Sequence, residues 1–195
     1  TTDLALILCL ETATTNCSVA LSQDGALLAL KEDRNNNYSH AEKLHVFIDE
    51  ILKENNLAVG DLEAIAVSKG PGSYTGLRIG VSTAKGLCFS LNIPLISIAT
   101  LASLAAQVEL KKGFVIPMLD ARRMEVYSTV FDKDLKEIRE TKAEVLDENS
   151  FTDYLEKDKV MFIGSGVEKF KAICTHSNAE FILDKLPSAR EMCSL

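Results

Sequence analysis

The order of predicted strands and helices recurs in the two halves of the chain, and this recurrence constrains the fold more than any other feature. In each half, three strand-like runs precede a helix, a strand, a second helix and a last strand. The first half places strands at residues 4–10, 17–23, 26–33, 64–68 and 94–98, and helices at 39–55 and 74–91. The second half places strands at 115–119, 125–131, 136–145, 160–163 and 181–183, helices at 149–157 and 166–174, and a further helical pattern from Pro187. We therefore predict two similar α/β halves, each a mixed sheet with helices, that meet near residues 99–112.

Two short motifs mark the ends of predicted elements. Asp24-Gly25 separates two strand-like runs, and both residues tolerate positive φ, so a two-residue hairpin turn is expected there. Ser39 and Glu42 have the spacing of a capping box, in which each side chain satisfies a backbone amide at the start of a helix.

Composition and charge exclude several classes of protein. The 195 residues carry 21 Lys and Arg against 28 Asp and Glu, so the formal net charge is −7, and the basic residues are scattered. A surface that binds nucleic acid by itself needs a basic patch, so autonomous binding of nucleic acid is not expected. The longest apolar run, residues 4–10, is far shorter than a membrane span and lacks the features of an export signal.

The cysteines and the chain ends also carry information. Five cysteines form no Cys-x-x-Cys pair, which favours free, buried thiols in a reduced, cytoplasmic protein. The chain begins at Thr1 and ends inside an apolar pattern at Leu195, so we expect the second half to be incomplete at its C-terminus.

A glycine-rich turn at residues 70–76 joins a predicted strand to a predicted helix, a position where backbone amides can hold an anion. Thr75 stands where a dinucleotide-binding turn would need glycine, and Leu77 stands where a phosphate-binding P-loop would need lysine. A tight turn with close helix packing is the favoured interpretation. Gly76 and Gly80, followed by Ala84, form a smooth strip on one face of the helix, which could lie against the protein's own sheet or against a partner helix.

Three other sets of residues were candidates for chemistry. Glu11, Thr12 and Thr14 end the first buried strand, where they could hold a magnesium-bound phosphate or simply form a hydrogen-bonded turn. Gly164-Ser165-Gly166 repeats the strand–glycine–helix arrangement in the second half, at another edge where a nucleotide could bind. The segment 120–123 ends a strand with Asp and two Arg residues, either a turn salt bridge or a functional pair.

Histidine spacing argues against a metal centre. His40 and His45 are five residues apart, so they point roughly 140° away from each other around a helix and cannot share one ion. His176 is far away in sequence and has no acidic or cysteine ligand pattern near it. No metal site is therefore predicted.

Four segments resemble the TsaB family, formerly called YeaZ. They are residues 8–14, 68–80, 119–127 and 187–190, and the resemblance extends over essentially the whole chain. It implies two ribonuclease-H-like halves of the actin/Hsp70/sugar-kinase superfamily, at residues 1–99 and 100–195. It also implies a partner, the related TsaD, which transfers a threonylcarbamoyl group to adenosine 37 of tRNAs that read ANN codons. TsaC makes the activated substrate, and the ATPase TsaE completes the bacterial set.

The chain departs from its catalytic paralogue at two positions that matter for chemistry. Thr100 and Leu104 stand where the resemblance places the two histidines of the TsaD metal motif. Without those ligands the chain resembles the non-catalytic partner, and it gives no support to the older peptidase or glycoprotease label. Glu11 replaces the aspartate of many relatives, and its extra methylene moves the carboxylate by more than about 1 Å, which argues against tight nucleotide or magnesium binding.

These considerations give a specific set of expectations. The chain is expected to dock on TsaD through its first-half helices, to dimerise with itself when alone, and to reach tRNA only through the complex. The expected partner-interface residues are His40, Leu44, Phe47, Gly72, Tyr74, Gly76, Gly80 and Ala84. No cofactor is expected to bind tightly, although ATP or ADP could sit at the junction with TsaD. The alternatives are a stand-alone nucleotide-binding or phosphotransfer enzyme of the same fold, using Glu11 and residues 164–166, and a disfavoured metallopeptidase.

Overall fold

The computed structural model describes residues 5–34 and 40–195 and divides the chain into two compact units. The first unit holds residues 1–103 together with Pro187–Leu195, and the second holds Leu104–Leu186. No helix within the described residues is long and apolar enough to cross a membrane.

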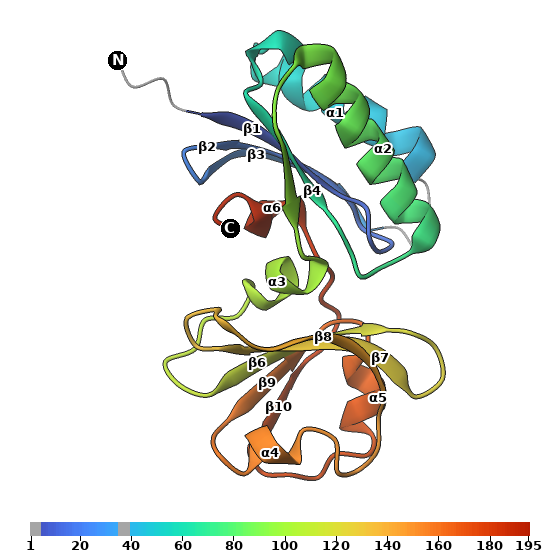
Figure 1. The fold of residues 1–195 in the computed structure, drawn as a ribbon, viewed down its shortest axis with the longest axis vertical. Helices are drawn as coiled ribbons and strands as arrows, with labels where there is room; N and C mark the ends of the chain where they lie inside the picture. The colour runs from blue at the N-terminus through green and yellow to red at the C-terminus, as the bar shows by residue number, and fades with distance from the viewer. Residues whose placement is uncertain (1–4, 35–39) are drawn as a thin grey trace. The chain divides into compact units, whose positions relative to one another are not determined.

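A five-stranded mixed sheet in the order β3-β2-β1-β4-β5 is the centre of the first unit (Figure 1). Its strands are β1 (Leu6–Glu11), β2 (Cys17–Gln23), β3 (Ala26–Asp33), β4 (Ala64–Ser68) and β5 (Leu95–Ile98). The strands β1, β2 and β3 are antiparallel neighbours, whereas β4 and β5 run parallel to β1. The β2–β3 connection confirms the predicted hairpin, because Asp24 and Gly25 both have positive φ (51° and 77°).

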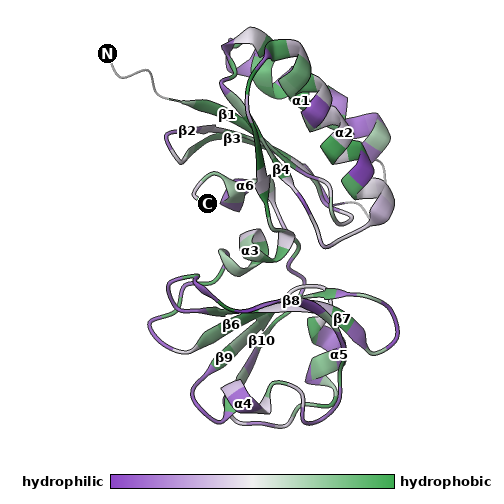
Figure 2. Cartoon of the chain, viewed as in Figure 1, coloured by the Kyte–Doolittle hydropathy of each residue, from purple (hydrophilic) through white to green (hydrophobic). Residues whose placement is uncertain are grey.

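Strand alternation divides the apolar side chains of the first unit between the two faces of its sheet. Helices α1 (His40–Glu54) and α2 (Tyr74–Leu91) cover one face, where Leu6, Leu8 and Leu10 of β1 pack (Figure 1). The opposite face holds Ile7 and Cys9 of the same strand, packed with the short C-terminal helix α6 (Ala189–Met192). Figure 2 shows the central strands of this sheet as strongly hydrophobic.

The second unit repeats the same topology. Its sheet has the order β10-β9-β6-β7-β8, with β6, β7 and β8 antiparallel and β9 and β10 parallel to β6. The strands are β6 (Phe114–Asp120), β7 (Glu125–Asp132), β8 (Glu137–Val145), β9 (Val160–Ile163) and β10 (Ala179–Ile182), with helices α4 (Thr152–Leu155) and α5 (Val167–Lys171). Four phenylalanine rings, at 151, 162, 170 and 181, form one cluster in its core. The predicted fold class, two ribonuclease-H-like halves, is confirmed.

The structure corrects the sequence prediction at the chain end. The expected division at 99 and 100 assigned all of the C-terminal residues to the second half, but Pro187–Leu195 belongs to the first unit. Asn16 donates a hydrogen bond to the Pro187 carbonyl at 2.9 Å, and the Ala189 amide donates to Ser18 at 2.9 Å. The segment therefore completes the face of the first sheet that α1 and α2 leave open.

Two short elements were not predicted, and one predicted feature cannot be assessed. Helix α3 (Thr100–Ala105) and the single-turn helix η1 (Val59–Asp61) lie in segments where the sequence predicts only connections. The capping box depends on Ser39, which lies outside the described residues, whereas the helix that it was expected to open is present from His40.

Candidate functional site

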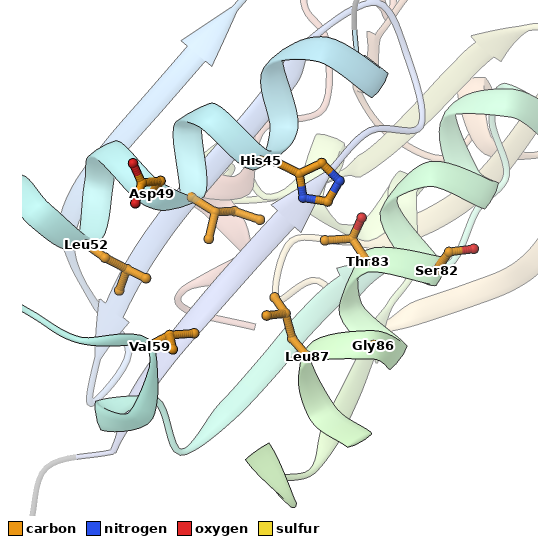
Figure 3. A pocket seen from close by; sticks show the side chains of 9 residues that line it. His45, Asp49, Leu52, Val59, Ser82, Thr83, Gly86 and Leu87 are labelled. Atoms are coloured by element: carbon orange, nitrogen blue, oxygen red, sulfur yellow. The ribbon is translucent and has the colours of Figure 1, made fainter. Parts of the chain in front are cut away.

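A groove runs between α1 and α2 on the outer side of the first unit (Figure 3). It has a volume of about 570 Å³ and an apolar floor. We call it the α1–α2 groove, and its lining residues are His45, Ile48, Asp49, Leu52, Val59, Ser82, Thr83, Gly86 and Leu87. His45 from α1 and Thr83 and Leu87 from α2 project toward the space between the helices (Figure 3).

Large apolar side chains on the same elements are exposed to solvent. Phe89 on α2 is 92% exposed and Tyr74 at the start of that helix is 74% exposed, while Val46 on α1 and Val59 beside it are about half exposed. Exposed apolar area on a protein surface is typical of sites where proteins bind one another. Together with the groove, these residues make the helical surface of the first unit the candidate interaction surface.

The glycine strip of α2 faces the protein's own sheet and not the groove. Gly76, Gly80 and Ala84 are buried, and the Thr12 hydroxyl donates a hydrogen bond to the Gly76 carbonyl at 2.7 Å. A β-carbon on Gly80 would overlap the Thr12 hydroxyl, and one on Gly76 would overlap the Thr12 carbonyl oxygen. The prediction that these three residues contact a partner is therefore wrong: all three are buried, and the small size of Gly76 and Gly80 serves the contact between α2 and the end of β1.

The other predicted interface residues divide by exposure. His40 and Leu44 are fully buried, so both belong to the interior of the first unit and are not contact residues. Phe47 is partly buried and packs against the core, and Tyr74 is exposed. Gly72 is exposed, but a β-carbon there would overlap the Ala13 carbonyl. Only Tyr74, Gly72 and part of Phe47 are therefore accessible to a partner.

None of the groove-lining residues was among the predicted interface residues, and Gly86 is the one that the sequence could have pointed to. It is exposed on α2, and a β-carbon built on it meets no atom within 4 Å. A glycine inside a helix costs about 1 kcal/mol relative to alanine, and no packing among the described residues requires glycine at this position. The sequence signal was available, because Gly86 lies off the stripe formed by Gly76, Gly80 and Ala84.

A buried carboxyl group ends strand β1. Glu11 has no exposed surface, and its Oε1 accepts a hydrogen bond from the Ala13 amide at 2.8 Å. Its Oε2 is also buried and makes no hydrogen bond among the described residues. Burial raises the pKa of Glu11 to about 7, against the opposing effects of the nearby backbone amides and the Ser68 hydroxyl. Ser68 in turn shares a 2.6 Å hydrogen bond with Thr100.

The residues next to Glu11 are engaged in local contacts. The Thr12 side chain is buried, and its hydroxyl donates to Gly76 as described above. The Thr14 hydroxyl accepts a bond from the Asn16 amide at 3.3 Å, and the Thr14 carbonyl contacts the buried His40 ring. Desolvation lowers the pKa of His40, so its ring is neutral at physiological pH. This end of β1 has the form of a hydrogen-bonded turn, the second of the two interpretations left open by the sequence.

The second predicted nucleotide-binding turn lies in the other unit. Gly164 has φ of 120°, and a β-carbon there would overlap the Met118 carbonyl oxygen, so a side chain at this position would be strained. The Ser165 hydroxyl is exposed and accepts a bond from the Asp120 amide at 3.0 Å, and the Gly166 amide donates to Met118. Asp120 also binds the Lys169 ammonium group, which donates to the Arg123 carbonyl at 2.7 Å. These contacts pack the 164–166 turn onto the β6–β7 hairpin.

The described residues contain no group of three or more His, Cys, Asp or Glu side chains that could hold a metal ion. At the two positions where the resemblance expects histidines, Thr100 and Leu104 are fully buried in α3. The Thr100 hydroxyl is hydrogen-bonded to the Ser68 hydroxyl, and Leu104 packs near Gly164.

Comparison with known proteins places the chain in a family. The family model described as TsaD, tRNA N6-adenosine threonylcarbamoyltransferase, matches residues 34–193. The TsaB protein of Buchnera aphidicola subsp. Baizongia pistaciae is 30% identical over 174 residues, which cover 86% of this chain and 78% of that protein. The chain belongs to the TsaB (YeaZ) family. The TsaB protein of Escherichia coli (strain K12) is 36% identical over 130 residues, 66% of this chain and 55% of that protein.

Solved structures agree with this assignment. A crystal structure of a Pseudomonas aeruginosa protein described as similar to peptidase YeaZ superimposes with a TM-score of 0.83. It is 27% identical and the match covers 98% of this chain and 89% of that one. The match to three of the curated TsaB relatives, including that of Escherichia coli, spans about half of their length. An 80-residue segment also matches the TsaD-type transferase of Bacillus thuringiensis at 39% identity, as expected for paralogues.

Proposed function

We propose that this TsaB-family chain is a non-catalytic partner subunit in tRNA threonylcarbamoyladenosine biosynthesis. It binds TsaD, which modifies adenosine 37 of tRNAs that read ANN codons. The observation that carries the proposal is the α1–α2 groove, an open apolar surface on a member of a family named for this pathway.

The candidate chemistry of the chain supports a binding role over an enzymatic one. The two positions expected to carry metal ligands hold Thr100 and Leu104. The Thr100 hydroxyl is hydrogen-bonded to Ser68, and Leu104 has no atom that can bind a metal ion. Glu11, the acid that a phosphotransfer enzyme would use, is sealed from solvent, and burial favours its neutral form. A neutral, buried carboxyl is a poor ligand for magnesium, which prefers ionised oxygen donors.

The groove suits a partner helix. Two helices with a gap between them offer a ridge-and-groove surface, and the open side of Gly86 lets a third helix approach α2 closely. Phe89 and Tyr74 do not line the groove, but both are exposed on α2, where a partner that extends beyond the groove along this helix would cover them. Because TsaD is a paralogue, it offers a related pair of helices, and so does a second copy of this chain.

Replacing Gly86 with Trp is expected to abolish complex formation with TsaD while leaving the chain folded. The indole would fill the groove, where the β-carbon position is open, and would exclude the partner helix. The measurement is size-exclusion chromatography with light scattering, with purified TsaD from the same source. The wild-type chain should give a 1:1 complex, and the variant should elute as free protein with an unchanged circular dichroism spectrum.

Lys111→Trp is the control for an added exposed indole. Lys111 is exposed in the second unit, outside the α1–α2 groove and off the helix that carries Tyr74 and Phe89. The Lys111→Trp variant should bind TsaD like the wild type. A wild-type chain that forms no complex with TsaD would refute the proposed function, whereas equal binding by Gly86→Trp would refute only the assigned surface.

The further expectations of the sequence remain predictions. They are a homodimer in the absence of TsaD, participation of TsaE and TsaC in the pathway, ATP or ADP at the TsaD junction, and contact with tRNA only through the complex. The light-scattering experiment also tests the first of these, because it gives the mass of the chain alone.

A further inference from the structure

Two cysteines far apart in sequence meet on the sheet face opposite α1 and α2. Cys9 lies in the middle of β1, the central strand of the first sheet, and Cys193 directly follows α6. Both belong to one apolar cluster with Ala189 and Met192. Cys193 packs against the cluster that contains Cys9, the two thiols interact, and neither is in a disulfide.

Backbone contacts hold Cys193 in this place. Its carbonyl accepts a hydrogen bond from the Ser22 hydroxyl at 3.5 Å, and its thiol donates to the Ala189 carbonyl at 3.7 Å. On the same segment, Ser188 is bonded to Glu32 of β3, and the Ala189 amide to Ser18 of β2. The thiols are therefore held near each other by a well-anchored segment and do not depend on a free chain end.

The two thiols differ in the properties that decide reactivity. Cys193 is half-buried, and its interaction with Cys9 lowers the pKa of Cys193 below the usual range of a thiol. The same interaction and burial raise the pKa of Cys9. One accessible thiol of lowered pKa beside one buried thiol is the arrangement of an attacking and a resolving cysteine.

We propose that Cys9 and Cys193 form a redox modification site, at which a hydroperoxide converts the two thiols into an intramolecular disulfide. The Cys193 thiolate attacks the peroxide, the O–O bond breaks, and a sulfenic acid and an alcohol or water result. The Cys9 sulfur then attacks the Cys193 sulfur, the S–O bond breaks, and the departing hydroxide takes the Cys9 proton to leave as water. The two thiols lose two electrons in total, and the peroxide gains them.

The disulfide would connect the C-terminal segment covalently to the central strand of the first sheet. It would close a loop that contains almost the entire chain, and such a loop removes much of the conformational freedom of the unfolded state. We expect the thermal midpoint of unfolding to rise by roughly 10 °C on oxidation. A thiol reductant should reverse the change completely.

The remaining cysteines provide internal controls. Cys17 and Cys88 are buried, burial raises the pKa of both thiols, to about 11 for Cys17, and Cys174 is partly exposed but lies in the second unit. Only the Cys9–Cys193 pair combines contact between thiols with access from solvent. Cys174 therefore reports on general oxidation, whereas Cys17 and Cys88 report on unfolding.

The test is treatment of the native chain with a small excess of hydrogen peroxide, alkylation of the remaining thiols, digestion without reduction, and mass spectrometry. We expect a linked peptide pair containing Cys9 and Cys193 in most molecules, with Cys17 and Cys88 alkylated only after denaturation. In Cys9→Ser, a sulfenic acid at Cys193 should accumulate and react with dimedone. Cys174→Ser should form the disulfide like the wild type.

Two results would overturn the proposal. One is native wild-type protein in which Cys9 and Cys193 both remain unoxidised under conditions that oxidise Cys174. The other is a disulfide that joins Cys193 to a different cysteine or to a second molecule. Both are read from the wild-type chain, so the outcome does not depend on whether a serine variant folds, nor on whether TsaD binds.

Discussion

Gly76→Ala is expected to lower the free energy of unfolding by roughly 3 kcal/mol, although alanine is the better helix former. The β-carbon would overlap the Thr12 carbonyl oxygen, which belongs to the backbone and cannot rotate away. The same displacement would break the 2.7 Å hydrogen bond from the Thr12 hydroxyl to the Gly76 carbonyl. Relief of the overlap therefore requires a shift of α2 away from the end of β1.

Gly86→Ala is the matched substitution for this prediction. It makes the same chemical change in the same helix, at a position where the new methyl group meets nothing within 4 Å. It should raise the free energy of unfolding by about 1 kcal/mol through helix propensity alone. Urea unfolding followed by circular dichroism measures the free energy of unfolding of both variants and of the wild type. Equal effects of the two substitutions would contradict the close contact between α2 and β1.

Glu11→Gln is expected to remove a large pH dependence from the stability of the protein. The pKa of Glu11 is about 7 in the fold against 4.5 for an unperturbed glutamate, because burial disfavours the carboxylate. The folded state thus binds the proton more tightly than the unfolded state. The Glu11 contribution is fully present below about pH 4.5 and is lost as pH rises toward 7.

The shift corresponds to about 3 kcal/mol, since one pKa unit is worth about 1.4 kcal/mol. Glutamine has nearly the same shape and no charge, so the variant should gain about that much over the wild type between pH 4 and pH 8. Urea titrations at several pH values give the free energy of unfolding of both proteins. His40 is present in both, so its contribution cancels in the difference between them. If the difference in the free energy of unfolding between the variant and the wild type stays constant from pH 4 to pH 8, burial does not raise the pKa of Glu11 and the carboxyl is ionised in the folded protein.

The fold was predictable because its signals are local. The hairpin at Asp24-Gly25 depends on two adjacent residues, and the helix α2 was predicted with its observed bounds, 74–91. The repeated order of elements then allows few topologies, because short connections place successive strands side by side. The two sheets accordingly have the same strand order relative to their central strands.

What could not be predicted was which surface each apolar or small residue would meet. Spacing alone showed that Gly76, Gly80 and Ala84 share a helix face, but a smooth face fits a partner helix as well as it fits Thr12. The pattern after Pro187 likewise indicated a helix, without showing which of two similar sheets it would cover. Such choices depend on hydrogen bonds between distant residues, such as that from Asn16 to Pro187.

Because Pro187–Leu195 belongs to the first unit, the two units can complete their folding at different times during synthesis on the ribosome. The second unit, Leu104–Leu186, is one continuous stretch, whereas the first is made of two pieces separated by it. The strands of the first sheet leave the ribosome early, but the first unit is incomplete until Pro187–Leu195 has been synthesised. The second unit can fold as soon as Leu186 has left the exit tunnel. Until Pro187–Leu195 has been synthesised, Cys9 and its neighbours on the sheet face opposite α1 and α2 remain uncovered. A chain that stalls before this segment would therefore expose an apolar surface that chaperones and proteases can recognise.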